Sequence, residues 1–451
     1  MTSLLSFIVL LPRIFLGFFI VHSIWNVKDG KSLLVKIFLS AGVGFGVSSL
    51  FSFLWIWVGL PLTVYAWVES ILAILLMIWL LFQNREILRI PQVTVKQEFL
   101  WLSFLAAGAL FFALNLILFG LQYPHGRPDA WINWNVVARF IYLGGSNWQA
   151  TFLRQWDHPD YPFLVPMTNA ITWVFLGNAS TWGPVALHFV LSLFAAGLLF
   201  AFVNIFRGFK QSVLSVLIFT SLPFVVNQGM RQYSDFLVAY LILAAGGLTL
   251  MYLQTKEKRI AVLVGLVIGL AGWAKNEGLM AILSVSFVWV LLALKKEGRT
   301  GLLRYVIGLV FPVVVIVLFK IFLAPSNDLI SAQESLADKI FDIERYKTIF
   351  SIAIPMLWNL GNTPISIIGL IILTALLVRR STNRITGLWA LAVIVLIQLT
   401  AYFGIFVLTP RDLAWHLNTS LDRLYLHILP LAFLLFFLWL KSPQELLSKE
   451  S

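Results

Sequence analysis

The sequence predicts an all-helical protein that crosses a membrane many times, and three observations support this prediction. Hydrophobic residues make up 60% of the 451 residues and charged residues only 12%, whereas a soluble domain usually carries about 25% charged residues. Long apolar runs recur along the whole chain. Short loops rich in Lys or Arg alternate with more varied loops between these runs. Such runs are typical of transmembrane helices, which need roughly 20 apolar residues each.

Thirteen runs are expected to be spans. The first begins near the N-terminus without a basic leader or a small-residue cleavage site, so we expect a retained span rather than a signal peptide. The runs 260–274 and 278–294 are short, so this hairpin is expected to be tilted or shielded by neighbouring helices. The predicted spans are 3–24, 33–58, 61–82, 99–121, 183–206, 210–226, 234–253, 260–274, 278–294, 303–323, 352–378, 386–409 and 423–440.

The basic loops predict the orientation of the chain. They are short and rich in Lys or Arg, as in QNREILRIPQVTVK and KKEGRTGLLR, and the positive-inside rule places such loops in the cytoplasm. The N-terminus is then expected outside and the C-terminus in the cytoplasm, in a prokaryotic inner membrane. The net charge of +12 then reflects orientation and attraction to anionic membrane lipid rather than nucleic-acid binding. The absence of cysteine excludes disulfides and thiolate metal sites.

This orientation places the ionisable and irregular loops on the outer side of the membrane. They hold nearly all the acids that lie outside the basic loops. Charged groups at a membrane boundary are costly and often mark function, so the asymmetry predicts a reaction or binding site at the outer leaflet. The expected outer loops are 122–182, 227–233, 275–277, 324–351 and 410–422.

The most unusual outer segment reads PDAWINWNVVARFIYLGG, from residue 128 to residue 145. Trp131 and Trp134 recur at helical spacing, Pro128 suits a first helical position, and the two final glycines suit a helix end. Tryptophan prefers the headgroup level, so we expect a short amphipathic helix along the membrane surface. Asp129 lies in its first turn, where the helix dipole also favours a carboxylate. It is either a helix-start residue or a functional acid.

Four more charged clusters fall on the same expected face. An apolar stretch at 163–176 follows the first of them, is too short to cross alone, and is expected to be a second interfacial helix. The clusters are WDHPDYP at 156–162, RQYSD at 231–235, AKNEG at 274–278 and DRLY at 422–425.

In order and spacing, these motifs resemble the GT-C superfamily of membrane glycosyltransferases. The similarity is to glycosyltransferase family 39 and its relatives, which include protein O-mannosyltransferases and the lipid A aminoarabinose transferase. It covers about 100–440. The chain departs from the family in a single acid, Asp129, where a pair is common, and in Lys-Asn-Glu-Gly, starting at Lys275, where the family has Lys-Gly. The resemblance implies a GT-C fold divided into three additional N-terminal spans (1–98), a catalytic module (99–323) with first outer loop 122–182, an outer loop (324–351) and C-terminal spans (352–451).

The resemblance also implies a reaction. A sugar passes from a polyprenyl-phosphate-linked donor to a glycolipid, glycan or protein acceptor at the outer face, with inversion and without a required metal. The acceptor must lose a proton to a base; we expect Asp129 in this role, with Asp157 and Asp160 as reserve acids. The leaving phosphate favours cationic partners, for which the candidates are Arg231, Lys275 and Arg423. The expected substrate-binding residues are Trp131, Trp134, His158, Tyr161, Tyr233, Asp235, Glu277 and Tyr425.

Several alternatives remain open at this point. A divalent metal bound by His125 and His158 with nearby Asp side chains is a possible but less favoured arrangement. A lipid-linked polysaccharide polymerase or ligase shares the outer-face chemistry. A lipid or solute transporter would show internal repeats, and no convincing repeat is found. No glycine-rich nucleotide loop is present either, which fits a lipid-linked donor. Loop 324–351 is expected to face the acceptor or to form a loose cap.

Overall fold

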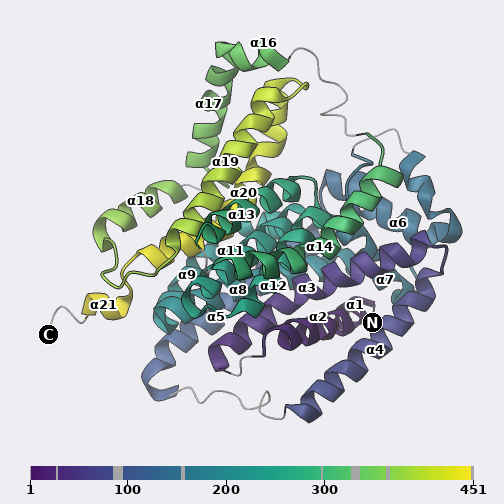
Figure 1. Cartoon of the computed structure of the whole chain (residues 1–451), viewed down its shortest axis with the longest axis horizontal. Helices are drawn as coiled ribbons and strands as arrows, with labels where there is room; N and C mark the ends of the chain where they lie inside the picture. The colour runs from purple at the N-terminus through teal and green to yellow at the C-terminus, as the bar shows by residue number, and fades with distance from the viewer. Residues whose placement is uncertain are drawn as a thin grey trace.

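The described residues form a bundle of α-helices without β-strands; an isolated antiparallel bridge joins Arg380 and Leu440. This confirms the predicted all-helical class. In Figure 1 the longer helices run side by side through the molecule, while α16 and α17 stand at its upper end. The computed structural model describes residues 2–26, 29–84, 95–153, 158–295, 298–326, 336–361 and 366–447.

The N-terminal helices pack closely through small residues. A Cβ on Gly17 would lie 1.9 Å from the Ser40 carbonyl oxygen, and one on Gly44 would lie 1.8 Å from that of Arg13. Glycine at both positions therefore lets the backbones of α2 and α3 touch, as is common between helices in membranes. These helices are α1 (Thr2–Ile8), α2 (Leu11–Ile24), α3 (Gly30–Trp57) and α4 (Leu62–Gln83).

The first outer loop folds mostly as helix. The expected helix begins beside Pro128 and ends at Gly144, and Gly145 adopts φ +54°, which glycine tolerates without strain. The stretch expected as a second interfacial helix is instead internal, because every residue from Leu164 to Trp173 is buried against α3, α6 and α8. The elements are α5 (Val95–Gln122), the π-helix η2 (Ala130–Trp134), α6 (Asn135–Gly144), the 3-10 helix η3 (Gly145–Leu153) and α7 (Leu164–Leu176).

The central helices form the core. Every residue of α11 from Asp235 to Leu253 is buried, and so is nearly all of α12. Neighbouring helices therefore shield the first half of the short hairpin, whereas its second half, α13, keeps large side chains such as Leu283 and Phe287 exposed. The helices α9 and α10 meet at a 68° bend, where Pro223 occupies the first turn of α10. The helices are α8 (Trp182–Arg207), α9 (Phe209–Ser221), α10 (Pro223–Met230), α11 (Asp235–Thr255), α12 (Lys258–Ala274), α13 (Glu277–Ala293) and α14 (Arg299–Phe322).

Two C-terminal expectations were wrong. The run 352–378 is not one helix, because α17 ends at Trp358 and α18 begins at Ile367. The last long helix, α20, begins at Leu413 rather than at 423, because the Asp412 carboxylate caps it by accepting a hydrogen bond from the Trp415 N–H at 2.7 Å. The helices are α16 (Leu336–Phe341), α17 (Ile343–Trp358), α18 (Ile367–Val378), α19 (Leu388–Leu408), α20 (Leu413–Trp439) and α21 (Pro443–Leu447).

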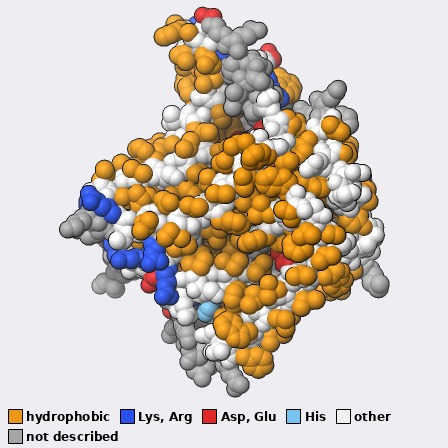
Figure 2. Space-filling model, turned by 45° about the vertical axis from the view of Figure 1, so that its right-hand side comes forward, with side chains coloured by type: hydrophobic (Ala, Val, Ile, Leu, Met, Phe, Trp, Pro, Cys, Tyr) orange, Lys and Arg blue, Asp and Glu red, His pale blue; other side chains and the backbone are white. Residues whose placement is uncertain are grey.

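The described residues contain nine helices long and apolar enough to cross a membrane, or ten if α9 and α10 are counted as one span. The predicted runs 260–274, 278–294 and 352–378 do not reach that length as single helices. Figure 2 shows apolar side chains spread over a broad face of the molecule, with Lys and Arg gathered at one edge. Large exposed side chains on α4 and α5, such as Trp79 and Phe111, suit contact with lipid. The chain is therefore an integral membrane protein.

Candidate functional site

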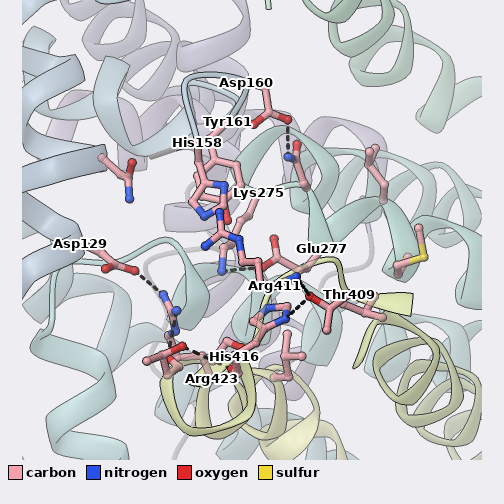
Figure 3. Close-up of a pocket in the computed structure, with 18 of the residues that line it drawn as sticks. Asp129, His158, Asp160, Tyr161, Lys275, Glu277, Thr409, Arg411, His416 and Arg423 are labelled. Atoms are coloured by element: carbon pink, nitrogen blue, oxygen red, sulfur yellow. Dashed lines mark hydrogen bonds and ion pairs between the residues drawn. The ribbon is translucent and has the colours of Figure 1, made fainter. Parts of the chain in front are cut away.

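A cavity of about 1100 Å³ opens at one end of the bundle. Its wall is built from the C-terminal ends of α14 and α19, the N-terminal ends of α13 and α20, and the loop before η2. Because successive spans run in opposite directions, these ends lie on one side of the membrane. Figure 3 shows the labelled side chains gathered around a common space. They come from the loop before η2, the segment before α7, the tip between α12 and α13, the loop before α20 and α20 itself.

Asp129 lies on the cavity wall at the start of the first-loop helix. Its backbone N–H donates to the Tyr233 hydroxyl at 3.2 Å, and its Oδ2 accepts a hydrogen bond from Arg423 Nη1. The Asp129 side chain keeps 32% of its surface exposed. Burial and the nearby charge of Asp129 raise the pKa of Tyr233 to about 12. Tyr233 is therefore a neutral hydroxyl that also contacts the Arg423 guanidinium, 5.7 Å from the centre of its ring.

The first-loop helix has an unusual start. The Asn135 N–H bonds to the carbonyl of Ala130, five residues earlier, which makes η2 a π-helical turn. Single π-turns inside α-helices occur frequently at functional sites. Below the turn, the Asn135 amide donates to Gln232 at 2.8 Å. This contact fixes the helix that carries Asp129 to the segment that carries Tyr233.

Lys275 lies at the tip between α12 and α13, almost fully buried. Its Nζ lies 2.8 Å from Asp235 Oδ1 and 2.7 Å from Glu277 Oε1. Burial alone would lower the pKa of Lys275, but the two carboxylates outweigh burial and raise that pKa, so the ammonium stays charged. Asp235 and Glu277 are each the first residue of a helix, where the helix dipole favours negative charge.

The tip is tight because of Gly278. A Cβ there would lie 1.9 Å from the Ala271 carbonyl oxygen. Asp235 Oδ2 and Glu277 Oε2 are buried without a hydrogen-bond partner. Buried polar atoms in this condition are uncommon and need an explanation. Glu277 lines the cavity, so a bound ligand with hydrogen-bond donors would satisfy its Oε2, whereas Asp235 lies behind Lys275 and does not line the cavity.

Two residues that the sequence did not single out hold Asp235 in place. His427 Nε2 lies 3.0 Å from Asp235 Oδ1, and His427 Nδ1 lies 2.9 Å from the Tyr402 hydroxyl. Both side chains are buried. His427 was visible in the motif before the last span, but nothing in its spacing indicates a partner on α11. We name Asp129, Asp235, Lys275, Glu277 and Arg423 the cavity cluster.

Asp160 belongs to a second polar group on the wall. Its Oδ2 accepts hydrogen bonds from Lys320 Nζ at 2.9 Å and from the Asn276 amide at 2.7 Å. Its side chain is only 3% exposed, and it is bonded to a cation. Lys320 was missed, although a lone lysine near the end of an apolar span is a recognised sign of function.

Arg231 lies between two cavities. Its Nη1 is 3.0 Å from Asp422 Oδ2, and its Nε donates to the Asn227 side chain at 2.8 Å. Arg231 lines the main cavity, and both Arg231 and Asp422 line a neighbouring cavity of about 590 Å³ between α10 and α17. Arg231 therefore faces the main cavity while its partner acid belongs to the smaller one.

Aromatic rings form one side of the main cavity. His158 stacks on Tyr161 with ring centres 4.6 Å apart, and Trp134 stacks on Tyr161 at 5.2 Å. Burial and the charge of Glu277 raise the pKa of Tyr161 well above its usual value. Tyr161 is thus a neutral aromatic surface, and Lys275 Nζ lies 5.7 Å from its ring centre.

Other expected substrate-binding residues do not reach the main cavity. Trp131 is 58% exposed and lies beside His125, whereas Trp134 and Asp235 lie behind Tyr161 and Lys275. Tyr425 is on a different face of α20 from Arg423, and its hydroxyl donates to the Ala353 carbonyl on α17 at 3.0 Å. The reserve acid Asp157 lies outside the described residues. The cavity wall adds Thr409, Arg411 and His416, which were not predicted.

Part of the cavity wall is apolar. Leu279 and Met280 of α13 line it together with Ala401, Gly404 and Ile405 of the neighbouring helix α19. A Cβ on Gly404 would meet nothing within 4 Å, so this part of the wall borders open space. The cavity therefore combines a charged, aromatic side with a hydrocarbon side.

Within the described part of the chain, no three His, Cys, Asp or Glu side chains are grouped to hold a metal ion. No family model matches the chain, and neither do any curated proteins or solved structures. The functional assignment therefore rests on the chemistry of the cavity.

Proposed function

We propose that this protein is a membrane glycosyltransferase that moves a sugar from a polyprenyl-phosphate donor to an acceptor at the outer face. The observation that carries the proposal is the composition of one cavity. A partly exposed carboxylate, Asp129, shares it with the cations Arg231, Lys275 and Arg423 and with an apolar wall. These are the groups that an amphipathic donor with a phosphate at the membrane boundary requires. The resemblance to the GT-C superfamily and its fold is part of this proposal.

In the proposed reaction the acceptor hydroxyl or amine attacks the anomeric carbon, and its proton passes to the Asp129 carboxylate. The bond from the anomeric carbon to the phosphate oxygen breaks, and both electrons leave with the polyprenyl phosphate. Positive charge near that oxygen stabilises the developing anion. A single displacement inverts the anomeric centre.

Arg423 contacts the proposed base, Asp129, and is also a candidate partner of the donor phosphate. In the structure it binds Asp129, and its buried Nε has no hydrogen-bond partner. A donor phosphate would compete with Asp129 for the guanidinium, because Arg binds phosphate through paired hydrogen bonds. We infer that donor binding frees Asp129 to act as a base, so the base becomes available only when a donor is present. Asp160 is a poorer base because Lys320 and Asn276 occupy it.

The test of function uses full-length protein in lipid nanodiscs with polyprenyl-phosphate-linked mannose, glucose and aminoarabinose. Mass spectrometry measures the release of polyprenyl phosphate. Gly404→Phe fills the open space on α19 and should abolish donor consumption without loss of folding. Leu396→Phe is the matched control, because Leu396 is 61% exposed on the same helix and does not line the cavity. Consumption of no donor, or equal consumption by both variants, would contradict the proposal.

A transporter is the second candidate, because one observation favours it. The 68° break between α9 and α10 is the kind of interrupted helix that transporters use at their binding sites. Against this, the charges lie at one end of the spans rather than halfway along them. Flux of polyprenyl-phosphate sugar between the leaflets of proteoliposomes, without its consumption, would favour transport.

A further inference from the structure

The end of the bundle opposite the main cavity contains a smaller cavity of about 220 Å³. It lies where α8, α19 and α20 meet the loop between α18 and α19. Arg423 borders the main cavity, and Trp439, on the same helix, borders the smaller one; sixteen helical residues separate them by about 24 Å. The orientation expected from the basic loops makes this the cytoplasmic end.

Three arginines line this cavity, and none of the described residues on its wall is acidic. They are Arg207, Arg380 and Arg384. Within the described part of the chain, Arg380 and Arg384 have no carboxylate within salt-bridge distance, and their guanidinium groups make no hydrogen bond. An arginine needs up to five acceptors for its N–H groups, so these two side chains are available to a ligand.

The floor of the cavity is rigid. Arg207 donates from Nε to the Leu438 carbonyl at 2.9 Å, and from Nη1 to Ser381 Oγ at 2.7 Å and the Asn383 carbonyl at 2.9 Å. Ser381 Oγ in turn donates to Glu445 at 2.6 Å. Glu445 lies behind the wall and offsets the charge of Arg207, which leaves the charges of Arg380 and Arg384 uncompensated.

The loop between α18 and α19 has an unusual backbone at this place. Arg379 adopts φ +62°, a conformation that costs energy for a residue other than glycine and often marks a functional site. Gly387 adopts φ +96°, and α19 starts after it without a side-chain cap. The free N–H groups of this first helical turn add to the positive potential. Trp389 and Trp439 flank the cavity, and tryptophan prefers the headgroup level of a membrane.

We propose that this cavity binds the phosphate group of an anionic lipid headgroup. Two uncompensated guanidinium groups match the charge and the bidentate hydrogen bonding of a phosphodiester. The two tryptophans and the exposed apolar residues of α18, such as Leu373 and Leu376, suit the adjoining acyl chains. The same donors would accept inorganic phosphate, so the experiment separates the two sources.

The test compares three full-length proteins in a neutral detergent by native mass spectrometry. They are the wild type, the double variant Arg380→Gln/Arg384→Gln, and the control Arg299→Gln/Arg304→Gln. The control removes two charges from the same end of the molecule without touching the cavity. Each protein is mixed with phosphatidylglycerol, phosphatidylcholine or inorganic phosphate. Thermal unfolding of the variants without lipid checks that they are folded.

The wild type should retain phosphatidylglycerol but not phosphatidylcholine. The cavity variant should lose affinity for phosphatidylglycerol by about tenfold or more, because charge-assisted hydrogen bonds to phosphate are lost. The control should change less than about twofold, as expected for diffuse surface charge. Equal losses in the two variants would overturn the site. If the wild type retained inorganic phosphate as well as it retains phosphatidylglycerol, the bound phosphate would not need to come from a lipid, and the lipid part of the proposal would be overturned.

Discussion

Two clusters of charged and hydrogen-bonding side chains in this protein contain similar residues but differ in their surroundings. The cavity cluster borders about 1100 Å³ of open space, and three of its buried polar atoms lack partners. The other cluster, which we name the N-terminal cluster, lies between α2, α3 and α4 and borders none of the cavities described above. It consists of Arg13, Ser48, Tyr65 and Glu69.

In the N-terminal cluster the charged side chains have hydrogen-bond partners within the protein. Glu69 accepts hydrogen bonds from Ser48 at 2.9 Å and from Tyr65 at 2.8 Å. Arg13 donates to the Val9 carbonyl at 2.6 Å and to the Thr172 hydroxyl of α7 at 3.3 Å. The cluster thus fixes the N-terminal helices to the core. This difference predicts that only the cavity cluster, which has open space and unused hydrogen-bonding atoms beside it, takes part in function.

The largest expected effect separates the clusters by activity. Asp129→Asn keeps the shape of the side chain but cannot accept the acceptor's proton, so turnover should fall by about 10²–10⁴-fold. Expression and thermal stability should stay close to the wild type, and donor binding should not weaken, because the donor phosphate no longer competes with a carboxylate for Arg423. Donor consumption in nanodiscs measures the turnover, and Asp338→Asn, an exposed acid on α16, is the matched control. Unchanged turnover in Asp129→Asn would reduce Asp129 to a helix-start residue.

Lys275 tests the cavity cluster by stability. Lys275→Met leaves Asp235 and Glu277 buried without their cation, so the free energy of unfolding should fall by about 3–5 kcal/mol. Adding Asp235→Asn should restore part of this stability but no donor consumption. Thermal unfolding in detergent and the donor assay give the two measurements. Full stability in the single variant would mean that the ion pairs are not structural at all, and restored consumption in the double variant would remove Lys275 from the phosphate site.

A smaller effect is expected in the N-terminal cluster. Arg13→Met removes hydrogen bonds to α7 and leaves their acceptors buried, so stability should fall by about 1–3 kcal/mol. Turnover per folded molecule should remain unchanged, because this cluster does not reach the main cavity. Chemical denaturation and the donor assay on the folded fraction check this. A loss of turnover as large as that of Asp129→Asn would contradict the separation of the two clusters.

The last prediction concerns the orientation of the chain in the membrane, and the cysteine substitutions that test it should not change the stability of the protein. A cysteine at Ser146, which is exposed on η3, should react with a membrane-impermeant thiol reagent from outside intact cells. A cysteine at Thr382, which is exposed at the opposite end, should react only after permeabilisation. The absence of natural cysteine leaves no background labelling. Labelling of Thr382 first would place the main cavity in the cytoplasm.

The sequence by itself determined the helical membrane class and the position of many charges along the spans. Hydrophobicity and Lys or Arg loops depend on the solvent that each segment meets, which is a local property. The limits of the first-loop helix were also local, because Pro128 and Gly145 act through their own backbones. The length of an apolar run did not predict every helix, however. The bend before α10 and the division of the run 352–378 into α17 and α18 were not predicted.

Only the tertiary structure decided which charges meet. Arg423 binds Asp129, 294 residues away, and His427 binds Asp235, 192 residues away; no spacing rule connects such pairs. Residues two positions apart on a helix point about 200° away from each other. The rotation of α20 about its axis therefore decides that Arg423 faces the main cavity and Tyr425 faces α17. Lys320 likewise gained a role only when α14 met the Asp160 loop. Packing, which joins distant helix faces, is the physical reason that the site could be located in outline but not assembled from the sequence.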